Sequence, residues 1–404
     1  MKQQNILIIG GGASGIVAAI IARRHKANVT ILERNSKIGK KILATGNGRC
    51  NFTNANTTKN DYNHPEFVSK AIDVFGPKMT MDFFESLGIA PKIEDLGKTY
   101  PLSEQASSIL DVLVYEINRI GVNVVTDAYV KSIKKTNNGF TVQLENGERY
   151  DADKVIISTG GKAMPSSGSD GFGYKLAEQL GHHATKVFPA LVKLKLDSPY
   201  LKQLDGVKIP GRVQLMHRNQ MLQEEEGDVL FTKTGISGPT ILQISRKANT
   251  LLAEKQEIWI KVILVNLLTR ADVEKRLSLS ASRPVDFSLV GLIHKKIIPS
   301  LLKEAGIKDH SILVSQLSPK EKNKLLQLLF DWRFLVMESH GFEDAQVTAG
   351  GIDINEIKSD TLESKLVKGL YFTGEIIDID GLCGGYNLQW AWSSGYLAGK
   401  SASN

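Results

Sequence analysis

The alternation of apolar and polar stretches is clearest in the first thirty-three residues of the chain. An apolar run at residues 6–9 leads into the glycine cluster at residues 10–15, and an alanine- and isoleucine-rich helical stretch follows over residues 16–24. A second apolar run at residues 29–32 predicts a strand that ends at Glu33. The pattern predicts a βαβ unit at the start of the chain.

The spacing of the glycines is the most informative feature of this unit. Gly10, Gly12 and Gly15 have GxGxxG spacing, and Ala13 and Ser14 lie between the last two. The first glycine permits a tight turn, the second lets backbone approach a pyrophosphate, and the third allows close packing of helix on strand. Glu33 is placed to accept hydrogen bonds from an adenosine ribose, and its charge disfavours a 2′-phosphate. The unit predicts an adenine dinucleotide site; the plain alternative is a glycine-rich turn in an ordinary βαβ unit.

Two later apolar runs also end in polar glycine loops. The run at residues 154–158 ends in Thr159, Gly160 and Gly161, and the run at 369–372 continues into residues 373–387. Open α/β sheets bind ligands at the carboxyl ends of their strands. We therefore expect one extended ligand to contact all three strand ends.

The remaining pattern divides into a helical part, a β-rich part and a mixed part. Residues 64–120 have mostly helical spacing, and residues 122–150 read as strands with a hairpin turn at Asn146-Gly147. From about residue 192 short strands alternate with turns; Ser237 is an expected N-cap for a helix from Pro239. Residues 270–338 are expected to be helical, which makes the middle of the chain an inserted domain, part β and part helical.

Length and composition agree with a multidomain globular protein. A chain of 404 residues is long for one hydrophobic core, and 42% hydrophobic with 23% charged residues is typical of folded proteins. The apolar start is interpreted as a core strand rather than a signal peptide, and no later run is long enough to span a membrane. The two cysteines form no CxxC, which disfavours a zinc site or a disulfide scaffold. The cytoplasm is the expected compartment.

The net charge of +7 is modest, but its placement is uneven. Six Lys and Arg and no acid lie between Arg34 and Lys59. This run predicts either neutralisation of cofactor phosphates on a solvated face or a surface that meets a polyanion such as RNA. The Lys and Arg between residues 246 and 303 are interpreted as solvated.

The ligand that best fits three glycine loops is FAD, bound non-covalently. The glycine cluster and Glu33 would hold its ADP half, the strand near Val130 would read adenine, and the N-terminus of the last helix would face the flavin. The residues that we expect to bind the cofactor are Gly10, Gly12, Ala13, Ser14, Gly15, Glu33, Arg34, Lys41, Thr45, Gly46, Arg49, Cys50, Asn51, Val130, Thr159, Gly160, Gly161, Gly374, Glu375, Asp380, Gly385, Tyr386, Asn387, Leu388 and Gln389.

Three motifs resemble a known family. GKKILATGNGRCN at residues 39–51, FTKTGISGP at 231–239 and TGEIIDIDGLCGGYNLQ at 373–389 are similar to the BaiN/RdsA group of FAD-binding proteins, also called HI0933-like flavoproteins. The resemblance covers essentially the whole chain. It implies a split Rossmann-like FAD domain of the glutathione-reductase-like type, residues 1–191 and 361–404, with an inserted α+β domain at 192–360.

The resemblance also implies an activity. Members of the group reduce conjugated C=C bonds, in steroid-like enones or in a uracil of large-subunit ribosomal RNA, with NAD(P)H as a transient reductant; amine oxidation, as in aminoacetone oxidases, is also allowed. Reduction needs a proton donor, and Cys50 and Cys383 are candidates because both lie in loops expected to contact FAD. A cysteine is also a common small packing residue.

Reduction of a ribosomal RNA uracil is our leading hypothesis, with the Arg34–Lys59 cations contacting RNA phosphates. A small-molecule enone reductase or amine oxidase is the first alternative. A flavin-containing RNA-binding factor without turnover is the second. No serine–histidine–aspartate order, HExxH or paired-acid motif supports hydrolysis.

Overall fold

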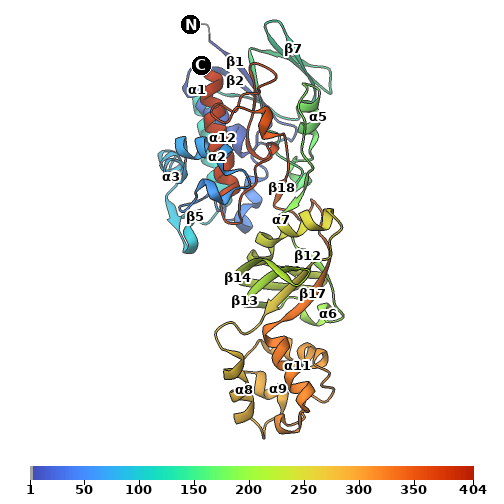
Figure 1. The fold of residues 1–404 in the computed structure, drawn as a ribbon. Helices are drawn as coiled ribbons and strands as arrows, with labels where there is room; N and C mark the ends of the chain where they lie inside the picture. The colour runs from blue at the N-terminus through green and yellow to red at the C-terminus, as the bar shows by residue number, and fades with distance from the viewer. Residues whose placement is uncertain (1–2) are drawn as a thin grey trace. The chain divides into compact units, whose positions relative to one another are not determined.

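The structure is a computed structural model that describes residues 3–404, and these form two compact units (Figure 1). The second unit is Pro189–Ala345, and the first contains the described residues on both sides of it. The unit boundaries differ slightly from the sequence-based ones, since residues 346–360 belong with the first unit. As a statement about independent domains, the division at 191/192 and 360/361 stays a prediction.

The first unit is built on a parallel sheet. Its five strands have the order β19 (Leu370–Phe372), β10 (Lys154–Ile157), β1 (Asn5–Ile9), β2 (Asn28–Leu32) and β6 (Asn123–Val125). Each neighbouring pair is parallel. The central strands are apolar on both faces, as a sheet covered by helices requires. The predicted α/β class with a Rossmann-like βαβ start is confirmed.

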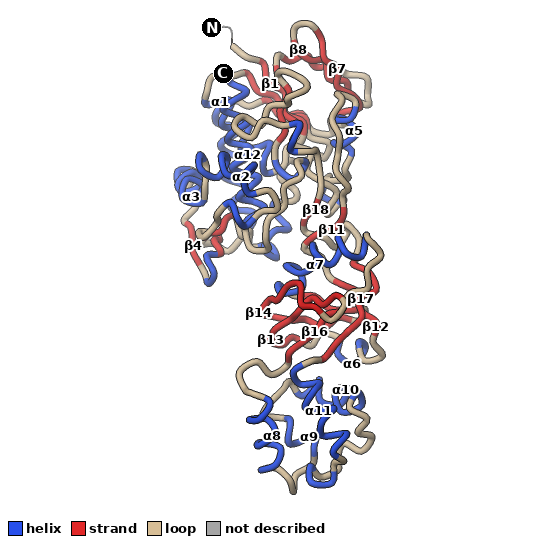
Figure 2. Tube along the Cα trace, in the orientation of Figure 1, coloured by secondary structure: helices blue, strands red, loops and turns tan. Residues whose placement is uncertain are grey.

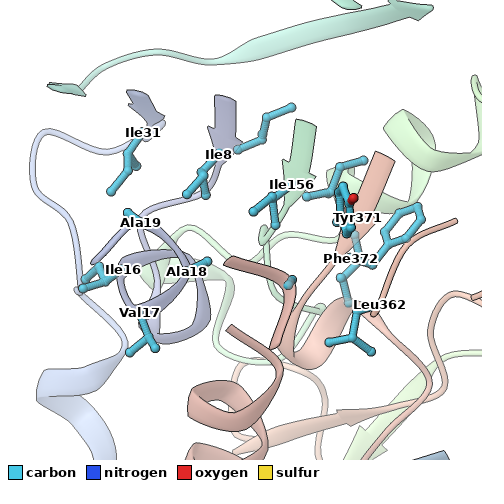
Figure 3. Close-up of a cluster of buried hydrophobic side chains, with 14 of the residues drawn as sticks. Ile8, Ile16, Val17, Ala18, Ala19, Ile31, Ile156, Leu362, Tyr371 and Phe372 are labelled. Atoms are coloured by element: carbon cyan, nitrogen blue, oxygen red, sulfur yellow. The ribbon is translucent and has the colours of Figure 1, made fainter. Parts of the chain in front are cut away.

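Two helices of this unit pack against each other at backbone distance. They are α1 (Ala13–Arg24) and α12 (Tyr386–Ser403). A Cβ added to Gly395 would lie 2.4 Å from the Ser14 carbonyl oxygen, and one added to Gly399 would lie 2.5 Å from that of Ala18. Figure 3 shows the side chains of α1 beneath those of β1, β2, β10 and β19. The C-terminal helix therefore joins the fold formed by the N-terminal βαβ unit.

Smaller elements surround this core. The helices are α2 (Pro65–Val74), α3 (Pro77–Ser86), α4 (Ala106–Ile120) and α5 (Phe172–Glu178). One small sheet has the order β3 (Thr53–Asn54), β5 (Lys98–Pro101), β4 (Pro91–Ile93), and another joins β7 (Val130–Thr136), β8 (Gly139–Leu144) and β9 (Arg149–Ala152). The strand β18 (Val347–Ala349) lies in the first unit, and β11 (Phe188–Ala190) runs across the chain boundary between the units.

The second unit contains a closed antiparallel barrel. Its order is β12 (Leu194–Asp197), β15 (Gly235–Ser237), β14 (Gln220–Thr232), β13 (Lys208–His217), β16 (Trp259–Ile263) and β17 (Trp332–Ser339). Phe231, Trp332 and Phe334 are buried in contact with one another. Two expectations are wrong here. Ser237 pairs with Leu230 in the ladder, so Gly238 is the N-cap, and residues 332–339 form a strand rather than a helix end.

The helices of this unit are α6 (Leu201–Leu204), α7 (Pro239–Ala253), α8 (Arg270–Leu279), α9 (Val285–Leu289), α10 (Ile298–Glu304) and α11 (Pro319–Phe330). The last four lie between β16 and β17 in the chain and group together beside the barrel (Figure 2). We call residues 266–331 the helical segment. Its buried leucines, isoleucines and valines share one core with the barrel.

Candidate cofactor site

The carboxyl ends of three neighbouring strands meet at one edge of the parallel sheet. The Ser158 hydroxyl, after β10, is 2.6 Å from the Thr373 hydroxyl, after β19. A Cβ added to Gly10, after β1, would lie 2.6 Å from the Ser158 carbonyl oxygen. The three glycine loops found in the sequence are therefore adjacent in space, where an open α/β sheet binds its ligand.

The glycine cluster forms a backbone cradle at the N-terminus of α1. Gly10 has φ +101°, and a Cβ on Gly15 would lie 2.1 Å from the Gly10 carbonyl oxygen. A Cβ on Gly12 would instead meet nothing within 4 Å. The helix has no side-chain cap and no acid in its first turn, and the N–H groups of residues 12–14 have no hydrogen-bond acceptor among the described residues. Free N–H groups, a helix dipole and open space fit a pyrophosphate.

Glu33 lies beside this cradle and is buried. Its carboxylate accepts hydrogen bonds of 2.8 Å from the backbone N–H of Gly11 and from the backbone and side-chain nitrogens of Asn35. A carboxylate has about four lone-pair positions, so acceptor capacity remains for a ribose hydroxyl. The Ala128 N–H donates to the Glu33 carbonyl oxygen at 2.9 Å, which brings the chain leading to Val130 to the same end of the site.

The basic loop after β2 is largely neutralised by distant carboxylates. Lys41 pairs with Glu375 at 2.7 Å, and Arg49 pairs with Glu94 at 2.6 Å and Glu104 at 3.1 Å. Arg34 pairs with Asp170, and Lys59 pairs with Glu66. The two ion pairs at Lys41 and Arg49 fix the loop of residues 39–51 rather than leaving free cations for phosphates. Gly46, Asn47, Gly48 and Cys50 have positive φ, which gives this loop its tight path.

The N-terminus of α12 is a second uncapped helix end. Its N-cap, Gly385, has φ +100°, and a Cβ there would lie 2.5 Å from the Thr53 carbonyl oxygen. No side chain caps the helix, its first turn has no acid, and the N–H groups of residues 386–388 have no acceptor in the described chain. This helix end can stabilise negative charge on a ring system by its dipole and free donors.

The side chains of Asn387 and Gln389, at this helix end, form hydrogen bonds within the protein. Asn387 Oδ1 accepts from the Gly381 N–H at 2.9 Å, and its Nδ2 donates to the Gly381 carbonyl oxygen at 3.0 Å. Gln389 is fully buried; it accepts from Thr53 at 2.5 Å and donates to Thr80 and Ser393. Asn387 can therefore serve a cofactor through its backbone N–H, while its side chain holds the loop. The Gln389 N–H donates to the Gly385 carbonyl oxygen at 3.0 Å, so its backbone and its side chain both hold the start of the helix.

Both cysteines lie near the uncapped end of α12, and both are close enough to Tyr100 to interact with it electrostatically. Burial raises the pKa of the Cys50 thiol to about 12, and it also raises the pKa of Cys383. Cys50 is fully buried, whereas Cys383 is half-buried beside the Lys98 ammonium. Burial likewise raises the pKa of Tyr100, whose ring lies 4.0 Å beneath the Arg49 guanidinium. Raised pKa values keep all three groups protonated at neutral pH.

Some residues at this edge of the sheet could not be assigned to the site from the sequence around them. Thr348, from β18, accepts hydrogen bonds from the Lys162 and Ala163 N–H groups at 2.7 and 2.8 Å. Its own N–H donates to Glu375 at 2.9 Å. The Thr159 hydroxyl is buried without a hydrogen-bond partner among residues 3–404, which is expected of a group that meets a ligand. Only the fold, which brings β18 to β10, reveals Thr348.

A serine–histidine–glutamate chain elsewhere in the first unit is structural. His182 Nε2 is 2.8 Å from the Ser364 hydroxyl, and its Nδ1 is 3.0 Å from Glu356. Ser364 is 2% exposed, and its oxygen already accepts from the N–H groups of Leu366 and Val367. A hydroxyl so saturated and buried cannot attack a substrate, so the chain is not a hydrolytic triad.

Residues 3–404 contain neither a metal-binding cluster nor a helix that could cross a membrane. No group of three or more His, Cys, Asp or Glu side chains is arranged to hold a metal ion. Within the same residues, every helix is too short or too polar to cross a membrane.

Known proteins resemble this chain over its whole length. Residues 4–401 match the family model described as HI0933-like protein Rossmann domain. The chain is 41% identical over 403 residues to a 3-dehydro-bile acid delta(4,6)-reductase of Clostridium scindens, covering 98% of each. It is 34% identical over 411 residues to a ribosomal RNA dihydrouridine synthase of Escherichia coli, covering 99% of this chain and 98% of that one.

Among solved structures, a 3-ketosteroid delta1-dehydrogenase from Sterolibacterium denitrificans has a TM-score of 0.51 at 10% identity and covers all of both chains. This likeness shows a shared fold. The individual residues named as FAD ligands stay a prediction, but the cradle, the two open helix ends and the family fit a flavin dinucleotide. The chain belongs to the HI0933-like family and is an FAD-dependent oxidoreductase.

Proposed function

We propose that the protein reduces a C=C bond conjugated to a carbonyl group, and that its substrate is a uracil of large-subunit ribosomal RNA. The names of both relatives describe this chemistry, since a 3-oxo-Δ4,6 steroid and a uracil each carry a double bond next to a carbonyl. The observation that carries the proposal is the uncapped N-terminus of α12, with two protonated thiols and a phenol close by.

The cradle of residues 10–15 and the N-terminus of α12 would hold FAD, which, once reduced by NADH or NADPH, would supply a hydride to one carbon of the double bond. The other carbon must receive a proton, so one NAD(P)H and one proton are consumed for each bond reduced. The free N–H groups of residues 386–388 stabilise negative charge at the flavin end of the site. The cradle of residues 10–15 holds the far end of the dinucleotide.

Cys383 is the better of the two proposed proton donors. A general acid must be protonated and must reach the substrate. Both thiols meet the first condition, because burial raises their pKa values, but Cys50 is fully enclosed while Cys383 is half-buried in the loop before α12. Lys98 lies close enough to lower the pKa of Cys383, which would favour proton release once negative charge develops on the substrate.

Rapid-mixing kinetics of Cys383→Ala and Cys50→Ala test this assignment. We expect Cys383→Ala to leave reduction of the flavin by NAD(P)H unchanged and to slow reoxidation by substrate by about 10²-fold or more. A larger loss in Cys50→Ala would assign the donor to Cys50. Equal, small losses in both variants would leave Tyr100, tested as Tyr100→Phe, as the donor.

The substrate is tested by mapping dihydrouridine in large-subunit ribosomal RNA of a strain that lacks the gene. We expect one or more sites to revert to uridine and to return on complementation. An unchanged map would contradict the RNA substrate. In that case the 41% identical bile acid reductase favours a conjugated steroid enone, assayed with the purified protein, FAD and NAD(P)H without oxygen.

The remaining alternatives have their own readouts. Rapid reoxidation of the flavin by oxygen, with peroxide release, would indicate an amine oxidase. Failure of both NADH and NADPH to bleach the flavin would indicate an RNA-binding factor without turnover.

A further inference from the structure

Positive charge is concentrated in the helical segment, residues 266–331. It has eleven Lys and Arg against seven Asp and Glu, a net charge of +4, whereas the whole chain has +7. The helical segment therefore contributes more than half of the excess charge in about one sixth of the residues. A local excess of this kind creates an attractive potential for anions.

The carboxylates of the helical segment are occupied by its own fold. Asp272 and Glu321 close the capping boxes of α8 and α11. Asp286 and Asp309 accept from neighbouring backbone N–H groups at 2.6 and 2.9 Å. The others lie in ion pairs or beside a phenol: Glu274 with Lys322, Asp331 with Arg333, and Glu304 with Tyr200. These carboxylates keep their charge, and Asp272 interacts electrostatically with Lys275 and Arg276, but among the described residues only Glu274 forms an ion pair with a cation of the helical segment.

Most cations of the helical segment have no partner in the described chain. Arg270 contacts Asn323 and Lys322 pairs with Glu274, at 3.4 and 3.5 Å. The side chains of the other nine make no hydrogen bond or ion pair to residues 3–404, and all except the half-buried Lys324 are exposed: Lys275, Arg276, Arg283, Lys295, Lys296, Lys303, Lys308, Lys320 and Lys324. Unpaired exposed cations are available to an external polyanion.

Apolar side chains are exposed among these cations. Leu279 is 79% and Phe287 is 60% exposed, and Arg283 lies between them in the chain, in the turn from α8 to α9. An exposed aromatic ring beside cations is the combination that binds unstacked nucleobases, because every base offers a π-face for stacking.

We propose that the helical segment is an RNA-binding surface of this protein. The inference rests on the proposed function, because an enzyme that reduces a ribosomal RNA base must hold the surrounding polynucleotide. The cations contact phosphates and Phe287 stacks on a base that the RNA structure leaves unpaired. Phosphate contacts release counterions, so binding through this surface weakens as salt increases.

Salt titration of RNA binding tests the surface in the full-length, flavin-bound protein. The variant combines Lys275→Gln, Arg276→Gln and Arg283→Gln, and the probe is a large-subunit ribosomal RNA transcript. Each phosphate contact that is lost should reduce the slope of log affinity against log salt by about one. We expect a slope smaller by about three, with unchanged flavin content and unfolding temperature.

A matched variant controls for net charge. Lys59→Gln, Lys78→Gln and Lys358→Gln also remove three positive charges, but these ammonium groups are paired with Glu66, Asp82 and Glu363 in the first unit. We expect its slope to stay close to that of the unmodified protein. An equal decrease in both variants would mean that RNA responds to total charge only, and the proposal would be wrong.

The outcomes separate this inference from the proposed function. Absence of salt-dependent RNA binding by the unmodified protein overturns the surface. Binding of phosphatidylglycerol vesicles, but not RNA, with loss in the helical-segment variant also overturns it and assigns the surface to a membrane. RNA binding that depends on the three cations, combined with an unchanged dihydrouridine map in the deletion strain, supports the surface and contradicts the proposed reaction.

Discussion

Two basic regions of the molecule look alike in the sequence and differ in the structure. The Arg34–Lys59 run has six cations and no acid, yet four of the six pair with carboxylates from other parts of the chain. The helical segment mixes acids with cations, yet nine of its eleven cations make no hydrogen bond or ion pair to residues 3–404. Charge density along a sequence therefore does not report the charge that a surface offers to a partner.

The difference follows from what each region does in the fold. The Arg34–Lys59 run contains the loop of residues 39–51, which must be held against other strand ends, and its ion pairs with Glu375 and Glu94 hold it. The helical segment is held by its apolar core, and its acids cap helices. Most of its cations therefore make no hydrogen bond or ion pair to the described residues.

The largest expected effect concerns the glycine cradle of the first unit. We expect Gly15→Ala to lower both FAD affinity and stability, because the added Cβ would lie 2.1 Å from the Gly10 carbonyl oxygen. FAD affinity should fall by about 100-fold or more, equivalent to about 2.7 kcal/mol. Equilibrium dialysis of FAD and urea unfolding of the apoprotein measure the two effects.

Gly12→Ala is the matched control for that prediction. Its Cβ meets no protein atom within 4 Å, so the apoprotein should be as stable as the unmodified one while FAD binding is weakened by the methyl group in the cradle. Unchanged FAD affinity in Gly12→Ala would show that the pyrophosphate does not bind at this cradle.

The second prediction concerns a paired carboxylate of the first unit. Glu116 is 3% exposed and binds Arg119 at 2.7 Å and Arg24 at 2.8 Å, and hydrogen bonding to Arg119 lowers the pKa of its carboxyl. We expect Glu116→Gln to destabilise the protein by about 1.5–3 kcal/mol at pH 7. Urea unfolding at several pH values measures this.

The pH dependence has a definite sign. A carboxyl whose folded pKa is lowered contributes stability above its unfolded pKa, near 4.5, and loses that contribution as the pH falls through the folded pKa. The difference between Glu116→Gln and the unmodified protein should therefore shrink below about pH 4.5. A difference that is constant down to pH 3 would mean that lost packing, not charge pairing, causes the destabilisation.

Local patterns in the sequence predict the parts of this fold that are themselves local. Apolar runs predict β1, β2, β10 and β19, and GxGxxG spacing predicts the turn at Gly10. At residues 332–339 the local pattern is ambiguous, because Trp332, Phe334 and Val336 are buried at alternate positions, as in a strand, but Leu335 and Met337, at the other set of alternate positions, are also apolar.

Long-range pairing could not be predicted in the same way. Lys41 and Glu375 are 334 residues apart in the chain, and only the order of strands in the sheet brings their loops together. The buried network of Gln389 similarly joins α12 to Thr53 and Phe75. A glutamine near a helix start predicts a cofactor ligand, and that stays a prediction; no local pattern predicts the partners, distant in sequence, that its side chain binds in the core.

The exposed ring of Phe287 provides a third prediction, for the helical segment. We expect Phe287→Ala to change the free energy of unfolding by less than about 0.5 kcal/mol, because the ring is 60% exposed. The same variant should weaken RNA binding by about fivefold, the loss of roughly 1 kcal/mol of stacking. Filter binding at low salt measures it, and Leu267→Ala, 90% exposed without a neighbouring aromatic in the chain, is the control.

The variant with the smallest expected effect tests whether any unpaired cation of the protein attracts RNA, or only the cations of the helical segment. Glu66→Gln removes the partner of Lys59 and creates an unpaired cation within the Arg34–Lys59 run. Both side chains are exposed, so breaking the pair should cost less than about 1 kcal/mol. If RNA contacts the helical segment alone, the salt slope of RNA binding should stay the same, because the freed ammonium is not part of the contacted surface. A slope that increases by about one would place RNA over the first unit as well, and the contrast between the two regions would then lie in pairing alone.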